Sequence, residues 1–130
     1  MKISIVTTNY NTDKYLDQTI QSVLGQKGDF KLEYIITDGG SKDNSLEIIK
    51  RYDKEVKDGK WGDNVEFKYI SEKDKGQSDG INKGLRMATG DIVAFLNADD
   101  IYLENTLNTV VEYFKDNPSC MWLTGYCSII

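Results

Sequence analysis

Two adjacent carboxylates, Asp99 and Asp100, follow a short apolar run at residues 92–96 after two intervening residues. Two like charges at the end of a buried strand repel each other unless a cation lies beside them. Mg2+ or Mn2+ would relieve that repulsion and would also accept diphosphate oxygens, because both ions prefer oxygen ligands. The alternative is that one aspartate caps a turn and the other faces water. The pair indicates a candidate metal site and leaves open which carboxylate is the ligand.

Polar side chains that suit a nucleoside follow two earlier apolar runs. Thr8 and Tyr10 come directly after the first run, and Asp38 with two glycines comes after the second. An aspartate at such a turn can accept the imide hydrogen of a pyrimidine, and Tyr10 can stack on a base. The alternatives are a structural turn at the glycines and half-buried packing of the tyrosine. These residues are therefore candidate nucleotide ligands.

Residues 75–79 lead into a predicted helix and offer backbone amides that favour anions. Asp79 lies in the first turn of that helix, where it would also complement the helix dipole. Lys83 and Arg86 further along can reach a phosphate or remain solvated. This segment is a third candidate part of a nucleotide site.

The absence of histidine excludes several kinds of chemistry. The chain has no His, so Ser-His and Cys-His nucleophiles and the usual zinc sites are ruled out. Cys120 and Cys127 lack metal-ligand spacing and are expected to be reduced thiols. Carboxylates, Lys, Tyr and metal-bound oxygen remain to carry any reaction.

The charge of the chain argues against a nucleic-acid partner. The formal net charge is -5, and the Lys and Arg residues are scattered along the sequence. An acidic protein that holds a phosphorylated ligand must neutralise it locally, with a metal ion, a helix N-terminus or a few placed cations.

Short apolar runs alternate along the chain with longer segments whose apolar residues recur at helical spacing, and this alternation predicts the strands and helices that position these groups. This alternation is typical of βαβ units, so we expect an α/β fold with a mainly parallel sheet and helices on both faces. The expected strands are residues 3–7, 34–37, 65–70, 92–96 and 121–126, and the expected helices run from about 16 to 24, 44 to 52, 77 to 88 and 106 to 117.

Several details of these elements are predicted as well. Asn44 and Glu47 form a candidate capping box, and residues 54–64 read as a loop. The helix over 77–88 is expected to bury Ile81, Leu85 and Ala88. The run at 92–96 is the most continuously apolar, which predicts a central strand covered on both faces.

The organisation of the chain predicts one domain. Residues 1–130 show no repeat or linker, no signal peptide precedes the first strand, and no apolar run approaches the length of a membrane span. A cytoplasmic location is expected, including the inner face of the membrane. In a parallel sheet the carboxyl ends of the strands meet at one edge, so the candidate groups are expected to converge there.

Taken together, the motifs resemble family 2 glycosyltransferases of the GT-A fold, which is Rossmann-like, over almost the whole chain. The segments that carry the resemblance are residues 4–11, 36–43, 74–84, 88–91 and 96–100. Asn97 stands where the family's DXD motif begins with an acidic residue, and Thr8 stands where many members carry proline.

The resemblance implies roles for particular residues. Nucleotide-binding roles fall to Thr8, Tyr10, Asp38, Asp79 and Asp99, and metal-binding roles to Asp99 and Asp100, with Mn2+ or Mg2+ as the cofactor. The implied activity is metal-dependent, inverting transfer from a nucleotide-diphosphate sugar, with UDP as the expected nucleotide. The implied acceptor is a saccharide or lipid-linked molecule in cell-surface glycan synthesis, and a membrane is met only through that acceptor.

In the family the catalytic base is an acidic residue of the acceptor half, so we expect it beyond Ile130 and expect this domain to end before that region. Two alternatives stay open. A sugar-phosphate nucleotidyltransferase would share the α/β sheet, although its Gly-rich, Arg-containing loop is absent from residues 8–11. A non-catalytic nucleotide-binding module would keep the fold without the reaction.

Overall fold

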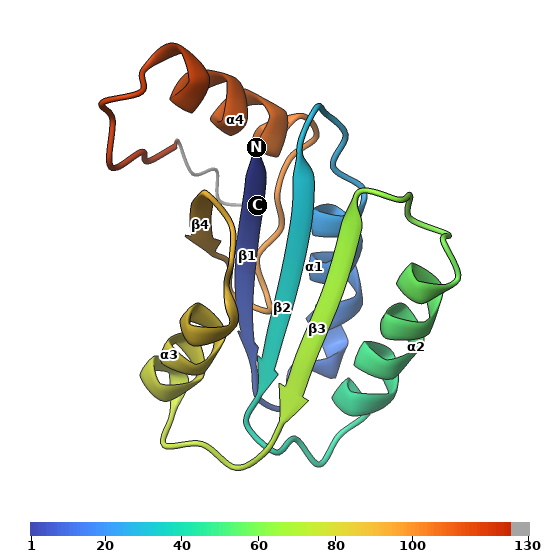
Figure 1. The fold of residues 1–130 in the computed structure, drawn as a ribbon. Helices are drawn as coiled ribbons and strands as arrows, with labels where there is room; N and C mark the ends of the chain where they lie inside the picture. The colour runs from blue at the N-terminus through green and yellow to red at the C-terminus, as the bar shows by residue number, and fades with distance from the viewer. Residues whose placement is uncertain (126–130) are drawn as a thin grey trace.

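The four strands of the sheet all run in the same direction (Figure 1). The computed structural model describes residues 1–125. In chain order the elements are β1 (Lys2–Asn9), α1 (Asp13–Leu24), β2 (Lys31–Asp38), α2 (Ser45–Lys57), β3 (Val65–Ser71), α3 (Gln77–Met87), β4 (Ile92–Phe95) and α4 (Thr106–Asp116). The predicted α/β class and parallel sheet are confirmed.

The strand order is β3-β2-β1-β4, which places β4 at an edge of the sheet among the described residues. It pairs with β1 from Ile3 opposite Ile92 to Val6 opposite Phe95. The prediction of a central strand covered on both faces is therefore wrong, since Val93 is 45% exposed and Phe95 is 38% exposed. Apolar composition indicated the strand but could not tell which neighbours it has.

Side chains alternate between two faces of the sheet. On β1, Ile3 and Ile5 enter the main core, which also holds the buried side of α1, while Val6 and Thr8 face α3. The core is completed by residues of β2, β3, α2 and α4, namely Leu32, Tyr34, Ile36, Ile49, Tyr52, Phe67, Leu107 and Val111. Helices on both faces of the sheet are thus confirmed.

Helix α3 meets the sheet through glycines. A Cβ atom added at Gly84 would lie 2.3 Å from Val6 Cγ1, and one at Gly80 would lie 3.0 Å from Thr8 Cγ2. The backbone of α3 therefore lies directly against β1. The prediction that Leu85 points inward is wrong, because it is 44% exposed. A search for apolar residues at helical spacing cannot find this face of α3, because the residues that contact the sheet are glycines.

The starts of α1 and α2 are capped by two aspartates. Asp43 accepts hydrogen bonds from the amides of Ser45 (2.9 Å) and Asp13 (3.0 Å), and Asp13 accepts one from the amide of Asn44 (3.1 Å). Asn44 makes no side-chain capping bond, so the predicted capping box is wrong. The shared caps tie both helix starts together at the carboxyl edge of the sheet.

The C-terminal part differs from the prediction in two places. Helix α2 continues to Lys57, which shortens the loop expected over 54–64. Residues 121–125 form no strand, and the end of the expected closing strand at Tyr126 lies outside the described residues, as does Cys127. Cys120 is a free, half-buried thiol. Within residues 1–125, no helix has the length and apolar character needed to cross a bilayer.

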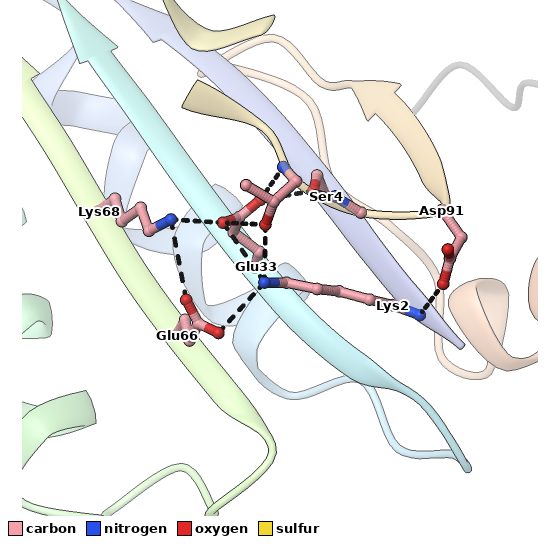
Figure 2. Close-up of polar contacts among 8 residues, drawn as sticks. Lys2, Ser4, Glu33, Glu66, Lys68 and Asp91 are labelled. Carbon is pink, nitrogen blue, oxygen red and sulfur yellow. Dashed lines mark hydrogen bonds and ion pairs between the residues drawn. The ribbon is translucent and has the colours of Figure 1, made fainter. Parts of the chain in front are cut away.

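A carboxylate, Glu33 on β2, is fully buried on the α3 side of the sheet. Its oxygens accept hydrogen bonds from Lys68 Nζ (2.6 Å), Ser4 Oγ (2.6 Å) and both the amide (2.8 Å) and the hydroxyl (3.0 Å) of Thr89. Figure 2 shows Lys2 and Glu66 completing this cluster, with Lys2 Nζ 3.7 Å from Glu33. Glu33 thereby joins β1, β2, β3 and the connection from α3 to β4.

This cluster keeps the carboxylate ionised. Burial alone would raise the pKa of Glu33, but the hydrogen bonds from Lys68, Ser4 and Thr89 lower it from 4.5 to about 2. Burial of an ionised carboxylate is tolerated only where donors surround it in this way.

Candidate functional site

The strand order places a reversal in the winding of the sheet between β1 and β4. The chain builds the sheet outward from β1 to β3 and then crosses to the other side of β1, so the direction of winding reverses there. In open α/β sheets, ligands bind beyond the carboxyl ends of the strands at such a reversal. The loops after β1, β2, β3 and β4, which contain the predicted site residues, all lie at this edge.

Asp38 ends β2 and is only 2% exposed. One carboxylate oxygen accepts from Asn9 Nδ2 (2.8 Å) and Ser41 Oγ (2.6 Å). The other accepts from the amides of Gly40 (3.1 Å) and Ser41 (2.9 Å) and from Ser71 Oγ (2.8 Å). Burial would raise the pKa of Asp38, but these donors hold it below its usual value. Asp38 thus ties together the ends of β1, β2 and β3.

The loops after β1 and β2 are joined a second time through Asn11. Its amide donates to Ser41 Oγ (2.8 Å), and its side-chain oxygen accepts from the amide of Lys42 (2.8 Å). Asn11 adopts a left-handed φ of 52°, which asparagine tolerates better than most residues. The sequence analysis did not assign this role, and the only signal for it is an asparagine in a predicted loop.

Thr8 and Tyr10 lie on this edge with different exposure. Thr8 is half-buried against Gly80 of α3, while Tyr10 is 61% exposed. A large aromatic ring that is mostly open to solvent at the carboxyl edge of the sheet is available to stack on a planar ligand.

The loop that leads into α3 packs against the loop after β2. A Cβ atom at Gly39 would lie 2.9 Å from a carboxylate oxygen of Asp74, so this glycine permits the close approach. Asp79 accepts from the amide of Lys75 (3.0 Å) and lies 3.6 Å from Lys83 Nζ, and these two groups hold the pKa of Asp79 below its usual value. Asp79 therefore closes the turn that begins α3.

Residues 97–100, which we call the acidic turn, follow β4. The amide of Asp100 donates to the carbonyl of Asn97 (3.1 Å), and Asn97 Nδ2 donates to Asp100 Oδ2 (3.2 Å). Gln77 Nε2 donates to Asn97 Oδ1 (2.6 Å), which links the acidic turn to the start of α3. The sequence analysis did not assign this contact of Gln77.

Asp99 and Asp100 are both exposed at this turn. Within the described part of the chain, no hydrogen bond or ion pair engages the Asp99 carboxylate, and no group of three or more acidic or Cys side chains could hold an ion by itself. Carboxylate and amide oxygens fit Mg2+ or Mn2+, and these ions commonly complete their coordination with phosphate and water. The donor set therefore suits a metal that arrives with a diphosphate.

The structure brings the predicted residues to one edge. Asp38 lies against the β1 end through Asn9, and Thr8 lies against α3. The start of α3 reaches the acidic turn through Gln77. The expectation that groups from separate loops converge at one edge of the sheet is confirmed by the parallel strand arrangement.

Comparison with known proteins identifies relatives of the whole chain. An uncharacterized glycosyltransferase of Nostoc sp. (strain PCC 7120) is 38% identical over 115 residues, which cover 88% of this chain and 33% of that protein. The poly(ribitol-phosphate) beta-N-acetylglucosaminyltransferase TarP of Staphylococcus aureus (strain N315) is 32% identical over 130 residues, covering 96% and 36%. The chain thus spans about a third of the length of these relatives.

The fold is shared with solved structures. The crystal structure of S. aureus TarS 1–349 in complex with UDP-GlcNAc superposes with a TM-score of 0.72 at 25% identity, over 89% of this chain and 32% of that one. The pattern of the family described as Glycosyl transferase family 2 matches residues 4–128. With nearly every residue inside that match and the same fold in TarS, the chain belongs to glycosyl transferase family 2.

Proposed function

We propose that this chain binds the donor of a glycosyltransferase that moves a sugar from a nucleotide-diphosphate sugar, with UDP as the nucleotide, to a saccharide or lipid-linked acceptor in cell-surface glycan synthesis. The observation that carries the proposal is the exposed acidic turn beside the winding reversal of the sheet. TarS has been crystallised with UDP-GlcNAc, and the name of TarP specifies a polymeric acceptor, which supports both substrate classes.

The residues at the edge would divide the donor between them. Tyr10 would stack on the base, with Thr8 beside it. The resemblance implied that Asp38 contacts the base, but its buried carboxylate already accepts five hydrogen bonds, so Asp38 would instead hold the loop that receives the base. Asp79 would shape the turn at the start of α3. The exposed Asp99 and Asp100 would face the ribose and the diphosphate.

Asp99 and Asp100 are also the groups that would hold Mn2+ or Mg2+. When bound, the ion supplies positive charge that stabilises the diphosphate as the leaving group. We propose that transfer inverts the anomeric centre and that the base which deprotonates the acceptor lies outside these 130 residues, in an acceptor-binding region after Ile130. The reaction would take place in the cytoplasm, at the inner face of the membrane when the acceptor is a lipid.

Titration with UDP in the presence and absence of Mn2+ tests the proposal. Mn2+ should tighten UDP binding by about tenfold or more, and Asp99→Asn and Asp100→Asn should each reduce that gain. Asp63→Asn makes the same chemical change in an exposed loop at the opposite edge of the sheet, and it should leave binding unchanged.

The alternatives predict other results. A nucleotidyltransferase would release pyrophosphate from a nucleoside triphosphate and a sugar phosphate. A non-catalytic assembly module would show neither heat nor a thermal shift with UDP and Mn2+. Either result would refute the proposed function.

A further inference from the structure

The acidic turn rests on a buried hydroxyl of α1. Thr19 is fully buried, and its Oγ1 lies 2.8 Å from the carbonyl oxygen of Ala98 and 2.7 Å from that of Asp100. These two carbonyls flank Asp99 in the chain. The one hydroxyl proton of Thr19 is thus shared between the carbonyls of Ala98 and Asp100, and the carbonyl of Tyr15 in α1 lies farther away, at 3.4 Å.

Thr19 is the first of three residues that hold this part of the chain. Ser22 Oγ accepts from the amide of Tyr102 (3.1 Å). Gln26, just past the end of α1, donates from Nε2 to the carbonyl of Leu103 (2.9 Å) and accepts at Oε1 from the amide of Leu107 (3.0 Å). The spacing of three residues puts Thr19 and Ser22 on one side of α1, and Gln26 follows just past its end. We call Thr19, Ser22 and Gln26 the polar seam.

The seam contacts only backbone groups of the segment it holds. The side chains of Asp99 and Asp100 remain exposed, while Ala98 between them and β4 is 4% exposed. A turn whose backbone is fixed in this way presents its carboxylates in one direction, which is what a metal site requires of its ligands.

We propose that Thr19 is a positioning residue for the metal-binding carboxylates of the acidic turn. It acts through the carbonyls of Ala98 and Asp100 and touches neither metal nor nucleotide. The inference rests on the proposed function and extends it, because it assigns to α1 the task of orienting the acidic turn.

Replacement of Thr19 by valine tests this role, since it removes the hydroxyl and keeps the shape of the side chain. Thr7→Val is the matched control. Thr7 is also fully buried, and its hydroxyl makes one buried hydrogen bond, to Tyr34 Oη (3.0 Å). Both variants lose a buried hydroxyl, but only Thr19 contacts the acidic turn. Thr19→Ser restores the hydroxyl.

The measurement is the Kd of UDP with and without Mn2+ for each variant, together with the melting temperature without ligand. In Thr19→Val the Kd with Mn2+ should rise about tenfold, as for outer residues that orient metal ligands, while the Kd without Mn2+ stays within about twofold. Thr7→Val should melt at a lower temperature, as Thr19→Val does, and keep the wild-type response to Mn2+. Thr19→Ser should recover that response to within about threefold.

The outcomes separate this inference from the proposed function. No effect of Mn2+ on the wild-type chain overturns both. An effect in the wild type that Thr19→Val retains as fully as Thr7→Val overturns the inference alone. If Thr19→Val does not fold, Ser22→Ala takes its place, and a response to Mn2+ equal to that of Thr7→Val again overturns the inference.

Discussion

Asp38 and Asp99 are carboxylates at the same edge of the sheet, but their surroundings suit them to different tasks. Asp38 is buried and accepts five hydrogen bonds, so removing its charge would release three strand ends at once. Asp99 is exposed, and its charge is available to a ligand. In the sequence both are aspartates that come after apolar runs. Only the hydrogen bonds in the structure show that Asp38 holds loops together, whereas the Asp99 carboxylate has no such partner among the described residues.

Glu33→Gln should lower the free energy of unfolding by about 3 kcal/mol at pH 7, because it removes one partner from a buried ion pair. Urea unfolding measures this change. Glu66→Gln makes the same substitution in the same cluster at a side chain that is 54% exposed, and it should change stability by less than about 1 kcal/mol. If the two substitutions lowered the free energy of unfolding equally, burial of Glu33 would not be the reason for its contribution to stability.

The same carboxylate predicts a dependence of stability on pH. The pKa of Glu33 falls from 4.5 to about 2 on folding, so the ionised form stabilises the folded chain above pH 4.5. This contribution should decline as the pH falls from 4.5 toward 2. Unfolding curves between pH 7 and pH 3 should therefore show the wild type losing its advantage over Glu33→Gln, whereas a constant difference would contradict the assigned pKa.

At this scale the sequence indicates the candidate ligand residues, but it does not indicate the buried residues that hold the strands and loops in place. Polar residues after apolar runs indicate Thr8, Tyr10, Asp38 and the acidic pair from the sequence alone, and their ligand-binding roles stay predictions. Glu33 gave one signal, a charged residue inside an apolar run, but nothing in the sequence shows that Lys68 and Thr89 meet it. Such contacts depend on strand order and register, which local patterns do not contain.

At the scale of elements, α3 shows how a glycine face replaces an apolar one. Gly80 and Gly84 are the buried residues of this helix, four positions apart on one side. The start of α3 reaches the acidic turn through Gln77, so the close approach of helix and sheet brings two loops of the candidate site together.

Gly84→Ala should destabilise the fold by about 1 to 3 kcal/mol, because the new methyl group would overlap Val6 and push α3 away from β1. Replacing glycine by alanine inside a helix normally stabilises the helix, so a loss of stability here would show that the overlap with Val6 outweighs the gain in helix propensity. Leu85→Ala, at the exposed neighbour, should lower stability by less than about 1 kcal/mol. Chemical unfolding of both variants gives the comparison, and a larger loss for Leu85→Ala would mean that the inward face is assigned wrongly.

At the scale of the whole molecule, the order of elements was predicted almost completely. Alternating apolar runs and helical periods gave the four strands and four helices of residues 1–125 in the right order. The place of β4 at the edge was not predictable, because the length and composition of a strand do not encode its neighbours. Nor did residues 121–125 become a strand, although their composition favours one.

The isolated chain should bind donor but transfer sugar poorly. The expected base lies outside these residues, so binding of UDP with Mn2+ should be measurable while sugar transfer stays close to the uncatalysed level. An assay with a radiolabelled UDP-sugar and a saccharide acceptor checks this, with a longer form of the protein as the positive control. Transfer by the isolated chain at a comparable rate would show that the base is already present.

The polar seam also bears on the order in which the chain folds. Its hydrogen bonds join residues that are 77 to 81 positions apart. Closing so long a stretch of chain carries an entropic penalty that is recovered only when the contacts form. The first two βα units can assemble from near neighbours, but the hydrogen bonds from α1 to the acidic turn form only when the last part of the domain docks there. Metal affinity should therefore appear as a late event in refolding, after the sheet has formed.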